Sequence, residues 1–223
     1  MELAEAERAA IEEGQRIART SGGVANVDEP RDPVEEWEFH VECQFKGLLS
    51  WARRRGCLLR LKDLPKRDFG PGGKEHCIYH DVEGGRFWKA TFPNASGVGP
   101  SGFFTPAGYL RRLRLSNCIF GDDVRFEGLL SRKAGISLVT SQHYVIPHPE
   151  RFIPTETEIV NCMNEYGFLP ESATIWKRDD GVTVGDVHDR NFIRRPDGVI
   201  EVIDVQPILR DGYEWENVRR ASR

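Results

Sequence analysis

The chain lacks the features that mark several specialised classes of protein. Its five cysteines are scattered along 223 residues and none forms a Cys-x-x-Cys pair, so we expect buried free thiols rather than a disulfide framework. No apolar run approaches the roughly 20 residues that span a bilayer. No internal repeat or low-complexity tract is present. These absences predict a protein with no membrane partner.

An excess of one charge is also missing. Lys and Arg number 31 against 35 Asp and Glu, a formal net charge of -4, which gives no reason to expect a nucleic acid partner. We interpret the arginine clusters at 111–114 and 219–223 as solvated faces. The acidic start lacks the basic flank of a secretory signal, and we expect a cytoplasmic protein. With 39% hydrophobic and 30% charged residues, the composition is typical of a folded globular domain.

The sequence predicts four regions. Residues 1–20 form a helix with a thin apolar stripe, expected to be peripheral. Residues 21–34 are polar and turn-rich, as in a linker. Residues 35–142 are predicted to contain a second helix followed by a strand-rich N-terminal lobe. Residues 143–223 would form a smaller C-terminal lobe.

The strand-rich part carries clear local signals. Residues 76–80 and 86–92 are strand-like and flank the turn Glu83-Gly84-Gly85, which predicts a hairpin. A helix is expected to begin at Thr105-Pro106, because threonine can cap free amides and proline is tolerated at the first helical position. Two more strands are predicted at 124–130 and 136–145.

The C-terminal part begins with a well-marked helix. Thr155 and Glu158 fit a capping box, and Gly167 can end the helix in a left-handed conformation. Residues 183–184 and 199–203 are strand-like and predict a short hairpin with polar residues between its strands. The predicted fold class is therefore α+β.

Three oxygen-bearing side chains lie in this hairpin. Asp186 is followed five residues later by Asn191, and thirteen residues further by Asp204 at the end of an apolar strand. Magnesium ions prefer oxygen ligands, and the charge of a transferring phosphate must be neutralised. Asn191 and Asp204 are the candidate metal ligands. Asp186 is the candidate that accepts the proton of an attacking hydroxyl or orients it, with Asp189 as its rival.

This spacing resembles the catalytic loop and metal-binding aspartate of protein kinases, and Gly-Asp-x-His-x-x-Asn is also the form found in aminoglycoside and choline kinases. More closely, residues 65–209 resemble the compact kinase-like domain found in polyvalent proteins of phages and conjugative elements. The motifs that carry the resemblance are Glu75-His76, Trp88-Lys89-Ala90-Thr91, Tyr109-Leu110, Phe120-Gly121-Asp122-Asp123, Val139-Thr140-Ser141-Gln142, Pro154-Thr155-Glu156-Thr157-Glu158-Ile159 and the segment from Asp186 to Asp204.

The resemblance implies a compact two-lobed fold. Its N-lobe would be an antiparallel sheet with one helix, and its truncated C-lobe would be mostly helical and carry the catalytic-loop hairpin. It also implies ATP and Mg²⁺ as cofactors. Lys89 would hold the ATP phosphates from a strand lining the cleft, although an exposed strand lysine is the alternative.

Two further elements of an ATP site are implied. Gly70, Gly72 and Gly73 would let backbone amides approach phosphate oxygens, unless they form a plain turn. Gln142 and His143 stand where a kinase has its hinge, whose backbone hydrogen-bonds adenine. His188, inside the catalytic loop, is expected to make a structural hydrogen bond rather than to transfer a proton.

The chain also departs from ordinary kinases. The helix that begins at Thr105 has no acidic residue before Asn117 to pair with the strand lysine, and Glu127 or Glu75 are the candidate substitutes. Few residues follow Asp204 to form an activation segment. We therefore predict an ATP- and Mg²⁺-dependent phosphotransferase acting on a protein Ser, Thr or Tyr hydroxyl. The alternatives are a small-molecule kinase and a catalytically silent nucleotide-binding module of a mobile element.

Overall fold

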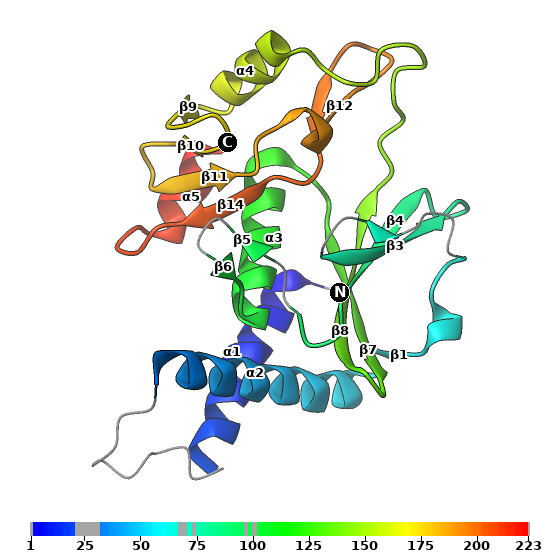
Figure 1. Cartoon of the computed structure of the whole chain (residues 1–223), viewed down its shortest axis with the longest axis vertical. Helices are drawn as coiled ribbons and strands as arrows, with labels where there is room; N and C mark the ends of the chain where they lie inside the picture. Colours follow the sequence, from blue (N-terminus) through cyan, green and yellow to red (C-terminus); the bar gives the residue numbers. More distant parts are fainter. Residues whose placement is uncertain are drawn as a thin grey trace. The chain divides into compact units, whose positions relative to one another are not determined.

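The structure is a computed structural model that describes residues 2–20, 32–66, 71–72, 75–95, 98–99 and 102–222. The chain divides into two compact units (Figure 1), the first made of Met1–Arg111 with Arg125–Gln142 and the second of Arg112–Val124 with His143–Arg223. Helix α3 (Pro106–Phe120) contributes residues to both. Among the described residues, no helix has the length and apolar character that crossing a bilayer requires.

The first unit contains a six-stranded sheet. Its strands, in spatial order, are β1 (Leu58–Leu59), β7 (Arg125–Arg132), β8 (Gly135–His143), β4 (Arg86–Thr91), β3 (His76–Asp81) and β2 (Pro71–Gly72). The predicted hairpin is confirmed, because β3 and β4 pair in antiparallel register from His76↔Thr91 to Asp81↔Arg86. The expectation of a wholly antiparallel sheet is wrong at one edge, where β1 runs parallel to β7. This pairing joins segments that are distant in sequence, so no local sequence pattern predicts it. A separate two-stranded sheet pairs β5 (Val98–Gly99) with β6 (Gly102–Phe103).

Two helices precede this sheet in the chain, α1 (Leu3–Thr20) and α2 (Pro33–Arg55). They approach so closely that a Cβ atom added to Gly47 would lie 2.7 Å from the backbone nitrogen of Gly14. The α2 helix begins after Asp32, whose side chain accepts from Val34 N, and ends at Gly56 in the left-handed conformation. Although a peripheral position was expected for residues 1–20, α1 is packed within the first unit and buries one face of small apolar residues.

The two faces of the sheet have different neighbours. One face carries a buried apolar cluster that includes Ala90 and Val139. On the other, Tyr109 of α3 lies with its hydroxyl 3.0 Å from His76 Nε2. Because successive side chains of a strand point to opposite faces and His76 pairs with Thr91, Lys89 lies on the same face as Tyr109 rather than beside Ala90.

The second unit contains helices and short sheets. Its elements are α4 (Glu156–Glu165), α5 (Trp215–Ala221), the 3₁₀ turn η2 (Asp189–Asn191), a sheet of β14 (Gln206–Leu209), β11 (Val182–Gly185), β10 (Trp176–Lys177) and β9 (Leu169–Pro170), and a pair of β12 (Phe192–Arg194) with β13 (Ile200–Val202). The capping box of α4 is confirmed, since Thr155 and Glu158 each accept from the other's backbone N–H. Gly167 has the expected left-handed φ of 79°.

Two expectations for this part of the chain are wrong. Residues 143–222 are not mostly helical, because they contain two α-helices but six strands. The strand-like runs near 183 and 200 do not pair with each other: β11 pairs with β14 and β10, and β13 pairs with β12. Strands of three or four residues carry too few alternating positions to be distinguished by their pattern. Pro207 also weakens the strand signal of β14, which is consistent with its place at a sheet edge.

Candidate functional site

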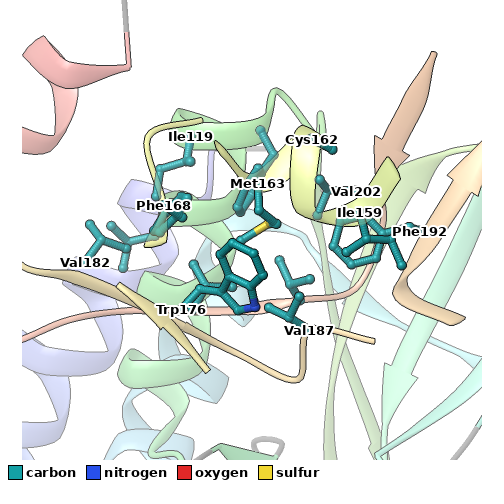
Figure 2. Close-up of a cluster of buried hydrophobic side chains, with 14 of the residues drawn as sticks. Ile119, Ile159, Cys162, Met163, Phe168, Trp176, Val182, Val187, Phe192 and Val202 are labelled. Atoms are coloured by element: carbon teal, nitrogen blue, oxygen red, sulfur yellow. The ribbon is translucent and has the colours of Figure 1, made fainter. Parts of the chain in front are cut away.

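The loop from Asp186 to Asn191 is fixed from within by apolar side chains. Val187 and Phe192 are buried in the core of the second unit, together with Val202 from the opposite strand (Figure 2). Each of these three residues is only 2 to 4% exposed to solvent. Asp186, directly before Val187, and Asp189, between Val187 and Phe192, are both exposed. The alternation of buried and exposed residues therefore directs the loop carboxylates toward the surface.

The backbone of Asp186 adopts an unusual conformation. Its φ is 60°, in the left-handed region that most residues avoid because Cβ crowds the backbone. Aspartate tolerates this region better than most residues, and such conformations cluster at functional sites, where the surrounding structure must hold them. Here the holding contacts come from Asn191.

Asn191 binds Asp186 through its side-chain amide. Its Nδ2 atom donates to the backbone oxygen of Asp186 at 2.7 Å and to carboxylate Oδ2 at 2.9 Å. The residue is only 7% exposed, so this geometry is set by burial as well as by hydrogen bonding. Since an amide nitrogen has two hydrogens, the carbonyl Oδ1 is the atom of Asn191 that can act as a metal ligand.

His188 contacts the other oxygen of the same carboxylate. Its Nδ1 accepts from the backbone N–H of Arg190 at 3.3 Å, which leaves the hydrogen of a neutral ring on Nε2. Nε2 lies 3.3 Å from Asp186 Oδ1. The ring therefore helps to orient the Asp186 carboxylate. The rival carboxylate of Asp189 lies 3.9 Å from His188 Nδ1.

Asp204 reaches this region through the hairpin of β12 and β13. Phe192 pairs with Val202, and the next backbone contact is from Ile203 N to Asn191 O at 3.0 Å. Asp204 therefore follows directly after the residue opposite Asn191. The hairpin thus brings Asn191 and Asp204 to the same end of β12 and β13, although they lie 13 positions apart in the sequence. Asp186 precedes the hairpin and is joined to it by the hydrogen bonds from Asn191.

The oxygen donors fit magnesium only in part. Within the described residues, no group of three or more His, Cys, Asp or Glu side chains could hold a metal ion. Mg²⁺ commonly binds one or two carboxylates and takes its remaining ligands from substrate phosphates and water. Asn191 and Asp204 match that incomplete protein contribution, so an ion held here would depend on the phosphates of a nucleotide.

A pocket of about 360 Å³ lies elsewhere in the second unit. Its lining comes from the end of β8 with the residues after it and from the turn and second strand of the β12–β13 hairpin. It comprises His143, Tyr144, Val145, Ile146, Arg195, Pro196, Asp197 and Glu201. Arg195 donates to Glu201 at 2.8 Å and to Asp197 at 2.9 Å. The hydrogen bond to Glu201, followed by the charge of Asp197, raises the pKa of Arg195. His143, a predicted adenine contact, is therefore beside a cavity.

The other residues predicted for the ATP site belong to the first unit, which is described by itself. Lys89 is partly buried on β4, opposite Ile78 of β3. Gln142 is 8% exposed on the neighbouring strand β8. Gly72 pairs with His76 at the β2 edge of the sheet, whereas Gly70 and Gly73 lie outside the described residues.

Glu127, one candidate partner for the strand lysine, has a hydrogen bond of its own. It lies where the register of β7 and β8 shifts between Phe126 and Gly128. Its Oε1 accepts from Ser141 Oγ at 2.5 Å, and the same hydroxyl accepts from Arg86 Nε at 2.8 Å. Its substitution for a helix glutamate, like that of Glu75, stays a prediction.

A buried arginine near the loop was not predicted. Arg194 is 8% exposed, donates two hydrogen bonds to the Glu158 carboxylate and donates a third to Arg151 O at 3.0 Å. Its backbone N–H binds Phe152 O, and its carbonyl accepts from His148 N. The hydrogen bonds from Arg194, and then from Thr155, lower the pKa of Glu158 to about 2. The sequence shows Glu158 as a helix cap and gives no sign of this second partner.

Comparisons with known proteins do not add a family to this description. A scan against family models, a search of curated proteins and a search of solved structures each returned no match. The resemblance to kinase-like domains therefore rests on the motifs of the chain itself.

Proposed function

We propose that this chain is an ATP- and Mg²⁺-dependent phosphotransferase of the protein-kinase-like kind. The observation that carries the proposal is the pair of hydrogen bonds from Asn191 to Asp186, in a hairpin that also positions Asp204. Asn191 and Asp204 adjoin the two strands of one hairpin, and Asp186 is hydrogen-bonded to Asn191, which supports the proposal. Asp186 combines a left-handed backbone with hydrogen bonds from a buried amide to both its backbone oxygen and its carboxylate.

Each residue has a distinct proposed role. Asp186 would orient the acceptor hydroxyl and take its proton as the oxygen attacks the γ-phosphorus. Asn191 Oδ1 and the Asp204 carboxylate would hold magnesium, which would supply charge neutralisation on the phosphates. The role of Lys89 in holding the ATP phosphates stays a prediction from the sequence. Asn191 and His188 together would keep the Asp186 carboxylate in place.

The acceptor class has two candidates. A Ser, Thr or Tyr hydroxyl of a protein is the first, since 44% of the Asp186 side chain is exposed and an exposed carboxylate can meet a macromolecular substrate. A small molecule is the second, because His188 lies against Asp186 as the fourth position of the Gly-Asp-x-His-x-x-Asn form. Transfer of ³²P to protein from a cell lysate, compared with ATP consumption across a metabolite panel, would separate them.

The decisive test of the nucleotide site is a thermal unfolding shift. ATP with Mg²⁺ at about 100 times Kd should stabilise the wild type by about 2.7 kcal/mol, because a ligand that binds only the folded state shifts unfolding by mass action. For a chain of this size that is a rise in Tm of roughly 5 to 10 °C. Adding EDTA should abolish the rise.

Two variants make this test specific. Asp204→Ala should lose the Mg²⁺-dependent rise, whereas Asp211→Ala, which removes an exposed aspartate from a turn, should keep it. A wild type that unfolds cooperatively but shows no shift with ATP and Mg²⁺ would refute the proposal, as would an equal shift in Asp204→Ala.

A further inference from the structure

The first turns of α2 carry an exposed apolar ridge. Val34, Trp37 and Val41 follow the i, i+3, i+7 spacing that places side chains on one face of a helix. Val34 is 63% exposed, Trp37 is 37% exposed, and Val41 is partly buried. Large apolar side chains in a row on a helix are typical of a contact surface rather than of a solvated face.

The ridge continues a stripe that is buried further along the same helix. Adding the same alternating steps of three and four residues to Val41 leads first to the partly buried Gln44 and then to Leu48 and Trp51, which are 0% and 8% exposed. The transition falls near Gly47, where α1 approaches α2. Trp37 lies ten residues before this point, or about 15 Å along the axis. Figure 1 shows the start of α2 extending past α1. The stripe therefore changes from exposed at Val34 and Trp37 to buried at Leu48 and Trp51.

Carboxylates line the ridge. Glu35, Glu38 and Glu42 repeat with the same i, i+3, i+7 spacing and are all exposed. Residues 32–42 contain five acidic residues and no Lys or Arg. Glu42 forms an ion pair with Lys46 at 2.6 Å. The local surface is thus apolar along one line and negative along the next.

We infer that this acidic apolar ridge is a docking surface for a protein partner that presents an apolar strip bordered by Lys and Arg. Charge complementarity selects this partner, because opposite charges around an apolar contact favour association. A second copy of the chain is disfavoured. Two such ridges laid together would bring the Glu35, Glu38 and Glu42 rows into proximity, and like charges at an interface oppose binding.

Trp37 should carry much of the affinity. Tryptophan is among the commonest interface anchors, and its truncation often costs a large part of the binding energy. The carboxylates should act mainly through long-range attraction, which is screened as salt rises. This inference is independent of the proposed phosphotransferase activity, because it depends only on α2.

The test uses the full chain and a synthetic amphipathic helical peptide, with leucines at heptad a and d positions and Lys and Arg beside them. A second peptide of the same length has Glu in place of every Lys and Arg. Isothermal titration calorimetry should show saturable binding of the basic peptide and at least tenfold weaker binding of the acidic one. Raising NaCl from 50 to 500 mM should weaken binding of the basic peptide.

Variants locate the site on α2. Trp37→Ala should weaken the basic peptide at least tenfold, and the double variant Glu35→Gln with Glu38→Gln should reduce its salt dependence. Val82→Ala removes a side chain that is 69% exposed on a different element, so it should bind as the wild type does. All these positions are exposed, and circular dichroism should show an unchanged fold.

Three outcomes would overturn the inference. They are the absence of saturable binding to the basic peptide, equal binding by Trp37→Ala, and equal binding of the acidic peptide. Sedimentation of the chain alone gives a further check, because a dimer that Trp37→Ala converts to a monomer would show that a second copy occupies the ridge.

Discussion

The two units use their polar side chains in different ways. In the first, Arg86, Ser141 and Glu127 are joined in a hydrogen-bonded series, and His76 lies against the Tyr109 hydroxyl. These groups are buried or half-buried and satisfy one another inside the fold. In the second, the loop carboxylates are exposed on a backbone strained at one aspartate. An exposed carboxylate that a buried amide holds in place, as Asn191 holds Asp186, is available to a ligand, whereas polar groups that satisfy one another inside the fold are not.

The largest effect should come from the helix contact of the first unit. Gly47→Ala would place a methyl group 2.7 Å from the backbone of Gly14, and two backbones cannot move aside as a side chain can. Overpacking costs about 1 to 3 kcal/mol, against a gain of about 1 kcal/mol from the better helix propensity of alanine. Because the neighbours are backbone atoms, we expect the upper part of that range, a net loss of up to about 2 kcal/mol in urea unfolding.

The matched variant Gly14→Ala should lower the unfolding free energy less, because the nearest atoms to its new methyl group belong to Gln44 at 3.1 Å and one of them is in a movable side chain.

The reactivity of two cysteine thiols reports the unfolding of the two units separately. Burial raises the pKa of Cys57 in the first unit and raises that of Cys162 in the second to about 11, so each should react with iodoacetamide only after unfolding. An unchanged midpoint for Cys57 in Gly47→Ala would contradict the packing argument.

A smaller, pH-dependent effect is expected in the second unit. The pKa of Glu158 is about 2 rather than the ordinary 4.5, chiefly because Arg194 donates to its carboxylate. A lowered pKa in the folded state means that ionised Glu158 stabilises the fold fully above about pH 4.5, and that this contribution is lost as the pH falls toward 2. Urea midpoints at pH 6 and pH 3 should therefore differ more in the wild type than in Glu158→Gln.

Glu156→Gln is the control for this experiment, since Glu156 is exposed in the same first turn of α4. It should keep the pH dependence of the wild type. If Glu158→Gln keeps it as well, another carboxylate must be responsible for the acid sensitivity of this unit.

The smallest effect on stability should follow from the isosteric replacement of Asp186 by asparagine. Asp186→Asn should change the unfolding free energy by less than about 0.5 kcal/mol, because asparagine tolerates the left-handed region and keeps an acceptor for Asn191. Asp186→Ala should cost about 1 to 2 kcal/mol through backbone strain and the lost hydrogen bond. Equal stability of the two variants would argue that the φ of 60° is not strained.

The same pair of variants addresses function. Asp186→Asn should keep the thermal shift with ATP and Mg²⁺ and lose phosphate transfer. If Asp186→Asn instead keeps the biological effect of the protein while ATP still binds, the chain is a catalytically silent nucleotide-binding module. The absence of an acidic residue before Asn117 in the sequence of α3 is consistent with that outcome.

Local signals in the sequence predicted elements well and pairings poorly. The capping box at Thr155, the hairpin of β3 with β4 and the left-handed Gly167 were all predictable, because each depends on residues close in sequence. The parallel partner of β1 and the exchange of strands among β11, β13 and β14 were not. These are decided by which segments meet in three dimensions, and short strands leave many pairings open.

The candidate site shows the same division. The spacing of Asp186, Asn191 and Asp204 was sufficient to select them as candidate site residues. The register of the β12–β13 hairpin explains why Asn191 and Asp204 are near each other although they are distant in sequence. The left-handed backbone of Asp186 and the bonds of Arg194 to Glu158 had no signal. The chain has many arginines, and the sequence does not show which of them contacts Glu158. Nor does the identity of an aspartate determine its backbone φ.

The amide of Asn191 has a consequence for which side chains the loop can accept. Aspartate has nearly the same shape and is an equally good oxygen donor for a divalent cation. At position 191, however, it would set a second anion within hydrogen-bonding distance of the first, where the amide now donates at 2.9 Å. Mutual repulsion would then disfavour the ionised pair, and the hydrogen bond that holds the Asp186 carboxylate would be lost. The loop therefore distinguishes two isosteric residues by charge alone, and asparagine is the one whose two ends can face a carboxylate and a metal at once.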